Sequence, residues 1–192
     1  AAEESSGGAV ANTIAGVASF GGSGGFVGKV RDDQLGDIFT HDIRSLGIAF
    51  DAAPATEGPS TARCLIAVTP DAERTLSTFL GTAGLLGPDD VDEALVARGK
   101  VVLAEGYLWD VPSAKDAIVK AMDHARAAGN RVALSLSDSF CVDRYRDEFL
   151  RSCEASGIAT CVLSPSKALD LVPSLNPALE EAVSVPDCSI DP

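Results

Sequence analysis

Residues 100–136 decide the fold class, and they read KVVLAEGYLWDVPSAKDAIVKAMDHARAAGNRVALSL. Two short, mostly apolar runs are predicted strands, Lys100–Ala104 and Arg131–Leu136. Because neither run alternates polar with apolar residues, both faces of each strand are expected to be buried. Pro112–Ala128 between them is a predicted helix, since proline occupies its first turn, apolar residues recur at helical spacing, and Gly129 follows its end. This strand–helix–strand unit predicts an α/β protein with a parallel sheet covered by helices on both faces.

The sequence on either side adds further elements. Downstream, we expect a helix over Val142–Cys153 and a strand over Ile158–Leu163. The Pro- and Ser-rich stretch 164–192 follows neither period, so it is predicted to be an irregular tail, either poorly ordered or with one irregular helix near Pro177–Val183. Upstream, the predicted elements are a helix over 11–20, a buried strand over Phe26–Val30, a helix over Asp33–Leu46, a hairpin of Arg63–Thr69 with Arg74–Leu80, and a helix over Asp89–Ala97.

Charge and composition exclude several classes of partner. Lys plus Arg number 15 and Asp plus Glu number 28, which gives a net charge of −13. We expect neither nucleic acid nor an anionic membrane as a partner, because both are polyanions. No apolar run is long enough to cross a bilayer and the N-terminus does not resemble a signal peptide, so we expect a cytoplasmic protein. The five cysteines form no C-x-x-C pair and are interpreted as reduced, mostly buried thiols, which excludes a zinc site.

Two acidic residues follow predicted strands. Glu105 comes directly after Lys100–Ala104, and Asp138 lies just beyond Arg131–Leu136. Ligands of parallel α/β sheets bind at the carboxyl ends of the strands, so either carboxylate could accept hydrogen bonds from a polyol or help hold Mg²⁺ through water. Asp138 could instead only cap the next helix. For Glu105 a functional and a structural role both remain open.

The N-terminal glycines and an asparagine form another candidate site. Asn12 follows Gly7 and Gly8 near a predicted helix start, where its amide could donate to and accept from a sugar hydroxyl, or could serve as an ordinary cap or turn residue. The glycines between residues 21 and 28 do not match the G-x-G-x-x-G pattern of dinucleotide-binding folds. His41 and His124 lie on predicted helices without a partner for catalysis and are interpreted as structural.

Five separated blocks carry a family resemblance. They are GGAVANT (7–13), FVGKVRDDQLG (26–36), TARC (61–64) with VTPDAERT (68–75), LAEGYLWD (103–110) and LSDSFCVDR (136–144). In this order the blocks resemble the PfkB, or ribokinase-like, carbohydrate and nucleoside kinases, especially their adenosine-kinase-like branch. The similarity covers about residues 5–152.

The resemblance implies a fold and a reaction. The fold would be an incomplete ribokinase-like parallel sheet flanked by helices, with a partial kinase domain over 1–163 and a small β lid at about 48–51 and 61–80. The reaction would be ATP-dependent phosphoryl transfer, with Mg²⁺, to a hydroxyl of a sugar or nucleoside. In this family the two glycines and the asparagine that match Gly7, Gly8 and Asn12 line the sugar site. A lid would exclude water during transfer.

Three family elements have no counterpart here. They are the opening strand with its substrate-binding Asp, the N-x-x-E element that organises Mg²⁺, and the G-A-G-D motif with its anion hole and catalytic base; no glycine follows Gly157. We therefore assign no catalytic and no metal-binding residue and expect an inactive fragment, with a frameshifted or truncated reading frame as the hypothesis for its C-terminal part. The rival interpretation is a non-catalytic module for small-molecule binding or dimerisation, with a homodimer formed through the lid.

Overall fold

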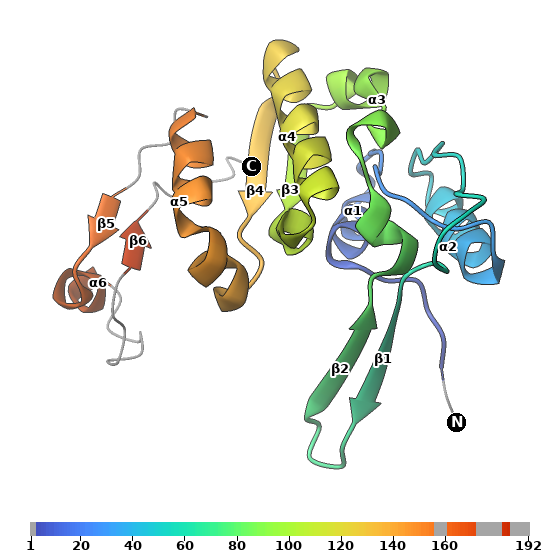
Figure 1. Cartoon of the computed structure of the whole chain (residues 1–192), viewed down its shortest axis with the longest axis horizontal. Coiled ribbons are helices and arrows are strands. Elements are labelled where there is room, and N and C mark those ends of the chain that lie inside the picture. The colour runs from blue at the N-terminus through green and yellow to red at the C-terminus, as the bar shows by residue number, and fades with distance from the viewer. Residues whose placement is uncertain (1–2, 156–160, 172–181, 185–192) are drawn as a thin grey trace. The chain divides into compact units, whose positions relative to one another are not determined.

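A computed structural model describes residues 3–155, 161–171 and 182–184, which are coloured in Figure 1. The chain separates into two compact units, residues 1–137 and residues 138–192. The hairpin and the strand–helix–strand unit belong to the first. Within the described ranges, no helix is both long and apolar enough to cross a membrane.

The first unit contains a parallel pair of strands, β3 (Val101–Glu105) and β4 (Arg131–Ser135), joined by helix α4 (Pro112–Ala127). The register pairs Glu105 with Ser135, so both strands end at the same edge. Helix α4 lies along both strands (Figure 1). These observations confirm the strand–helix–strand unit predicted from residues 100–136.

The two faces of the β3–β4 pair have different surroundings. Helix α4 is closely packed through small side chains that are at most 1% exposed: Ala114, Ala117 and Ala125. Val102 and Val132 of the strands pack against the same cluster. Side chains alternate between the faces of a strand, and Val101 and Leu103 on the other face are 47% and 37% exposed. The described contacts thus place α4 against one face, and helix α1 also contacts β3, while full coverage of the other face stays a prediction.

A second core in this unit lies between helices α1 (Ala9–Ser19) and α2 (Gln34–Ser45). Its centre is three phenylalanine rings whose centroids are 5.6 to 5.8 Å apart in tilted or edge-on contact: Phe26, Phe39 and Phe50. Such arrangements place the positive edge of one ring against the negative face of the next. Ile48 and Phe50 are 2% and 1% exposed, so the chain that follows α2 is part of this core.

The segment Phe26–Val30 is not the strand that we predicted. Only its flanks pair in parallel with the chain after α2, through single bridges from Gly25 to Ala49 and from Arg31 to Ala55. Its apolar residues are compatible with a buried strand, but the backbone between the bridges forms no continuous ladder. The segment is thus a connection whose apolar side chains serve the core.

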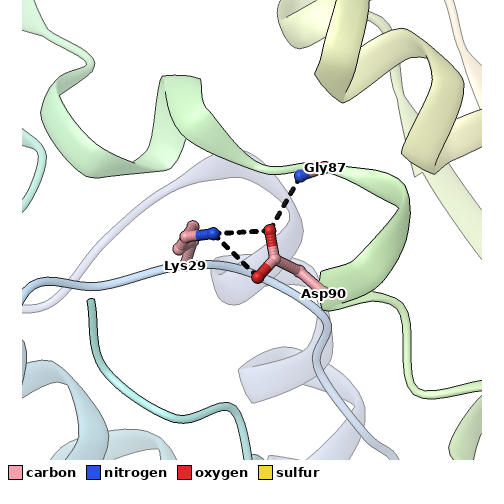
Figure 2. Close-up of polar contacts among 3 residues, drawn as sticks. All are labelled: Lys29, Gly87 and Asp90. Carbon is pink, nitrogen blue, oxygen red and sulfur yellow. Dashed lines mark hydrogen bonds and ion pairs between the residues drawn. The ribbon is translucent and has the colours of Figure 1, made fainter. Parts of the chain in front are cut away.

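An ion pair holds this connection in place (Figure 2). Lys29 Nζ lies 2.8 and 2.7 Å from the two carboxylate oxygens of Asp90, and Gly87 N donates to Asp90 Oδ2 at 2.8 Å. Both charged side chains are about three-quarters buried, with 22% and 25% exposed. A largely buried carboxylate that accepts three hydrogen bonds from two donor groups is well satisfied, so the pair fixes the connection against the 3-10 turn Pro88–Asp90.

Short helices complete the first unit. The route from the hairpin to β3 and on to α4 consists of η1 (Gly81–Leu85), η2 (Pro88–Asp90), α3 (Glu93–Arg98) and, after β3, η3 (Gly106–Asp110). The predicted helix over Asp89–Ala97 is thus split into a 3-10 turn and a shorter α-helix.

Strands β1 (Arg63–Val68) and β2 (Arg74–Phe79) form the predicted antiparallel hairpin. Every residue of both strands is exposed, and the hairpin extends away from α1 and α2 (Figure 1). The segment 48–51, which we expected to join the hairpin in a lid, instead contributes Ile48 and Phe50 to the second core. The exposed β appendage is therefore β1–β2 alone.

Asp33 ties the base of the hairpin to the start of α2. Its carboxylate accepts hydrogen bonds from Gly36 N at 2.9 Å, Thr61 N at 2.9 Å and Thr61 Oγ1 at 2.7 Å. Burial favours the neutral acid, but these bonds and the nearby Arg31 charge outweigh it, so the pKa of Asp33 lies below its usual value. At Gly36 a Cβ would lie 2.0 Å from Arg31 O, so only glycine allows this close approach.

The second unit contains α5 (Ser139–Ala155), α6 (Pro165–Leu171) and an antiparallel pair of β5 (Cys161–Leu163) with β6 (Ala182–Ser184). The helix and the strand predicted near α5 and β5 are confirmed in type, but β5 pairs with β6 instead of joining a parallel sheet.

The tail also differs from expectation. Residues 165–171 are a regular helix, and residues 182–184 are a strand where part of the helix near Pro177–Val183 was predicted. Short apolar runs of this kind fit either element, so pattern alone could not separate them. Residues 172–181 lie outside the described ranges, and the domain boundary at residue 163 stays a prediction.

Phe50→Ala is expected to lower the free energy of unfolding by about 3 to 5 kcal/mol, because it leaves a cavity among the phenylalanine rings. Phe20→Ala is the matched control, since Phe20 is 93% exposed, and should change it by at most about 0.5 kcal/mol. Urea unfolding followed by the fluorescence of the buried Trp109 measures both variants. Equal effects would contradict the assignment of this core.

Candidate active site

The carboxyl ends of β3 and β4 bring two polar side chains together. Glu105 ends β3, and Ser137 lies two residues beyond the end of β4. Ser137 Oγ donates a hydrogen bond to Glu105 Oε1, and Gly106 N donates to the same oxygen at 3.2 Å. Within the described ranges no hydrogen bond reaches Glu105 Oε2. That oxygen is therefore an open acceptor at the edge where α/β sheets bind ligands.

Helix α1 starts immediately after the glycine pair. Gly8 caps the helix with φ of 115°, a conformation that favours glycine, and Asn12 N donates to Gly8 O at 2.8 Å. Asn12 is thus the fourth helical residue, and the alternative that it is a cap or turn residue is wrong. Its side chain is exposed, and its amide has no hydrogen bond to the described part of the chain.

The two candidate groups lie on neighbouring elements. Helix α1, which carries Asn12, contacts β3, which ends at Glu105. No hydrogen bond joins these two side chains among the residues that the structure describes. Their participation in a common binding site, together with Gly7 and Gly8, stays a prediction.

Asp138 opens the second unit as a helix cap. Its Oδ1 accepts a hydrogen bond from Cys141 N at 2.9 Å, which satisfies one of the free N–H groups in the first turn of α5. Asp138 therefore caps α5, as one of the two alternatives predicted. A binding role through its other oxygen stays a prediction.

The aromatic side chains near Glu105 and the two histidines are the other residues considered in the sequence. Trp109 is 2% exposed and belongs to the core, whereas the neighbouring Tyr107 is 48% exposed. His41 Nδ1 lies 3.2 Å from Asp42 Oδ1, and His124 Nε2 lies 3.3 Å from Glu93 Oε1.

The cysteines are less uniformly buried than predicted. Cys64, on the hairpin, is exposed, whereas Cys141 is buried and Cys153 is intermediate; all three are free thiols. Burial, followed by the charge of Glu154, raises the pKa of the Cys153 thiol. The expectation of mostly buried thiols is wrong for Cys64, because its strand has both faces exposed.

The resemblance to PfkB kinases implies Mg²⁺ with ATP, and a bound Mg²⁺ requires oxygen ligands that converge on one point. Within residues 3–155, 161–171 and 182–184, no group of three or more His, Cys, Asp or Glu side chains converges as metal ligands would. Glu105 and its serine partner by themselves do not meet this requirement. These residues do not form a metal site on their own, so no metal-assisted step is assigned to them.

Comparison with known proteins places the chain in a family. The model of the pfkB family of carbohydrate kinases matches residues 1–161. This chain belongs to the pfkB family. The structure is similar to that of adenosine kinase from Sinorhizobium meliloti, with a TM-score of 0.76 and 54% identity over 79% of this chain and 46% of that one.

Two further relatives support the assignment. A "probable sugar kinase protein" from Rhizobium etli has a TM-score of 0.72 and 50% identity over 76% of this pfkB-family chain and 44% of that one. A fructokinase of Solanum tuberosum is 30% identical over 64% of this chain and 39% of its own length. The likeness confirms an incomplete ribokinase-like α/β fold, and the chain spans less than half the length of these relatives.

Sequence reasoning missed Ser137. Ser137 lies in the segment 136–144 that carries part of the family resemblance, but a serine after a strand does not by itself indicate a binding role. Its contact with Glu105 depends on β3 and β4 being adjacent and parallel.

Asp138→Ala is expected to lower the free energy of unfolding by about 1 kcal/mol, because Cys141 N loses its acceptor. Asp138→Ser should recover most of this loss, since a serine hydroxyl can cap the same N–H. Thermal or urea unfolding compares the two variants. If Ala and Ser were equally destabilising, Asp138 would act other than as a cap.

Proposed function

We propose that this chain contributes the acceptor-binding part of a cytoplasmic, ATP-dependent kinase that phosphorylates a hydroxyl of adenosine or a related ribosyl compound. The observation that carries the proposal is the open Oε2 of Glu105 at the carboxyl edge of β3 and β4. Membership of the pfkB family supports the reaction type. The 54% identity to an adenosine kinase supports a nucleoside as the acceptor.

Each proposed binding group has a distinct chemical role. Glu105 Oε2 accepts a hydrogen bond from a ligand hydroxyl, and the Asn12 amide both donates and accepts. At Gly7 a Cβ would meet no atom within 4 Å, so the space beside this glycine is open to a ligand. Gly8 provides the backbone turn into α1. Asp138 remains a proposed substrate contact, since its cap uses only Oδ1.

We propose that the hairpin β1–β2 acts as a lid over this ligand. Its strands are exposed along their whole length, while its base is anchored through Thr61 to Asp33. Anchored at its base and with exposed strands, the hairpin suits an element that covers a bound molecule and excludes water.

Phosphoryl transfer also needs groups that these elements do not supply. The acceptor oxygen attacks the γ-phosphorus of ATP, ADP leaves, and a base takes the hydroxyl proton. The G-A-G-D motif that provides the base and the anion hole in this family does not occur in the 192 residues. We therefore propose that the chain as given binds the acceptor and does not turn over ATP.

Calorimetry with adenosine, ribose and fructose, without ATP, tests the binding proposal. Saturable binding of adenosine is expected, and Asn12→Ala should weaken it about tenfold by removing a hydrogen-bonding amide. The same substitution should leave stability unchanged or raise it slightly, because Ala is the better helix former and the amide has no partner in α1.

Asn130→Ala is the matched control. The Asn130 amide donates to Ala97 O at 3.0 Å and Val96 O at 3.3 Å, so its loss should destabilise the fold while adenosine affinity stays unchanged. Absence of saturable binding by the unmodified chain would overturn the proposal of an acceptor site. Turnover of ATP above a no-enzyme control would overturn the proposed inactivity.

A dimerisation module is the second candidate function, and the exposed apolar residues of the hairpin favour it. Leu65, Ile66, Val68 and Leu76 are between 55% and 70% exposed. Among the residues that the structure describes, the sheet consists of these two strands, so each has one edge without a neighbouring strand there. Open edges and apolar faces together favour pairing with the hairpin of a second copy.

Multi-angle light scattering tests the dimer. The unmodified chain should show concentration-dependent dimers, and Ile66→Lys should shift it to monomer by placing a charge among the apolar side chains. Leu46→Lys is the control, because Leu46 is similarly exposed at 49% but follows α2. A monomer at every concentration, or equal effects of both substitutions, would contradict a dimer formed by the hairpin.

A further inference from the structure

Ser137 has an unusual backbone for its residue type. Its φ is 69°, and Ala72 in the hairpin turn, at 67°, is the other non-glycine residue with positive φ in the described ranges. This region is sterically disfavoured for residues with a Cβ, and glycine occupies it freely. A serine here therefore retains its side chain at a cost to stability, which points to a task for the hydroxyl.

The local hydrogen bonds direct that hydroxyl. Ser137 N donates to Ser135 Oγ at 3.2 Å, which connects the turn to the last residue of β4. Ser137 Oγ then donates to Glu105 Oε1 across the sheet edge. A serine hydroxyl has one proton, so this bond uses its entire donor capacity.

The consequence falls on the carboxylate of Glu105. Gly106 N and Ser137 Oγ both donate to Oε1, one from the neighbouring backbone and one from the adjacent strand end. Two donors from different directions restrict the side-chain torsions of the glutamate. The torsional freedom that binding would otherwise remove is therefore already lost before a ligand arrives. They also distinguish the two oxygens, because one is occupied and Oε2 stays open.

We propose that Ser137 is a positioning residue for Glu105: it holds the carboxylate so that Oε2 is presented to a hydroxyl of the bound acceptor. This inference rests on the proposed function for the identity of the ligand, but not for the positioning itself. Ser137 acts through the glutamate and makes no contact of its own with the ligand.

Two substitutions separate positioning from a structural role. Ser137→Gly removes the hydroxyl and relieves the backbone, so its melting temperature should equal or exceed that of the unmodified chain. Ser137→Ala removes the same hydroxyl but keeps the disfavoured backbone, so it should melt below Ser137→Gly. Both should bind adenosine about tenfold more weakly, as supporting residues typically do. Ala72→Gly calibrates the gain in melting temperature from relieving a similar φ.

A more stable variant that binds less well cannot be explained by damage to the fold. If Ser137→Gly bound adenosine as tightly as the unmodified chain, positioning by Ser137 would be overturned. If the affinity fell only in Ser137→Ala, in proportion to a lower melting temperature, the role would be structural.

The number of Glu105 conformers in the absence of ligand tests the positioning role separately from the proposed function. Crystal structures of the unmodified chain and of Ser137→Gly should show Glu105 in one conformer in the first and in several in the second. If adenosine does not bind at all, the proposed function fails, and the conformers still decide the positioning role. A single, unchanged Glu105 conformer in Ser137→Gly would overturn it.

Discussion

The parallel pairing of β3 with β4 is the constraint on which the candidate site depends. Parallel strands end at the same edge, and the register that pairs Glu105 with Ser135 places the residues after β4 beside the end of β3. Residues 32 positions apart, Glu105 and Ser137, can therefore share a hydrogen bond. A shift of one residue would turn every side chain of the shifted strand to the other face and separate these groups. The packing of α4 on the same strands fixes that register.

In the first unit, apolar packing holds the helices and strands together, and polar contacts fix the connections between them. Alanines on α4 allow close approach to one face of the strands, and phenylalanine rings fill the space between α1 and α2. Buried polar groups then fix the connections that apolar packing alone would leave adjustable. Asp33 joins the start of α2 to the hairpin base, and the pair of Lys29 with Asp90 joins the segment after α1 to the 3-10 turn η2.

The proposed site combines fixed and open groups, an arrangement that would suit ligand binding. Glu105 Oε1 is held by two donors, whereas Oε2 and the Asn12 amide have no partner in the described part of the chain. Groups held in place by the fold lose little entropy when a ligand arrives. The family assignment gives this arrangement its chemical context, since pfkB proteins are carbohydrate kinases. The hairpin, with its exposed apolar side chains, is the element for which we propose two roles, lid and dimer contact.

The sequence by itself determined the features that depend on neighbouring residues. Helix α4 follows from its proline start and apolar period, helix α2 from the helical spacing of its apolar residues, and the hairpin from its turn residues; the family resemblance followed from five ordered blocks. Tertiary structure alone decided what depends on distant partners. Whether Phe26–Val30 forms a ladder, and which strand pairs with β5, depends on backbone groups elsewhere in the chain. The same reason explains Ser137, whose importance comes from a glutamate on another strand that no local pattern could reveal.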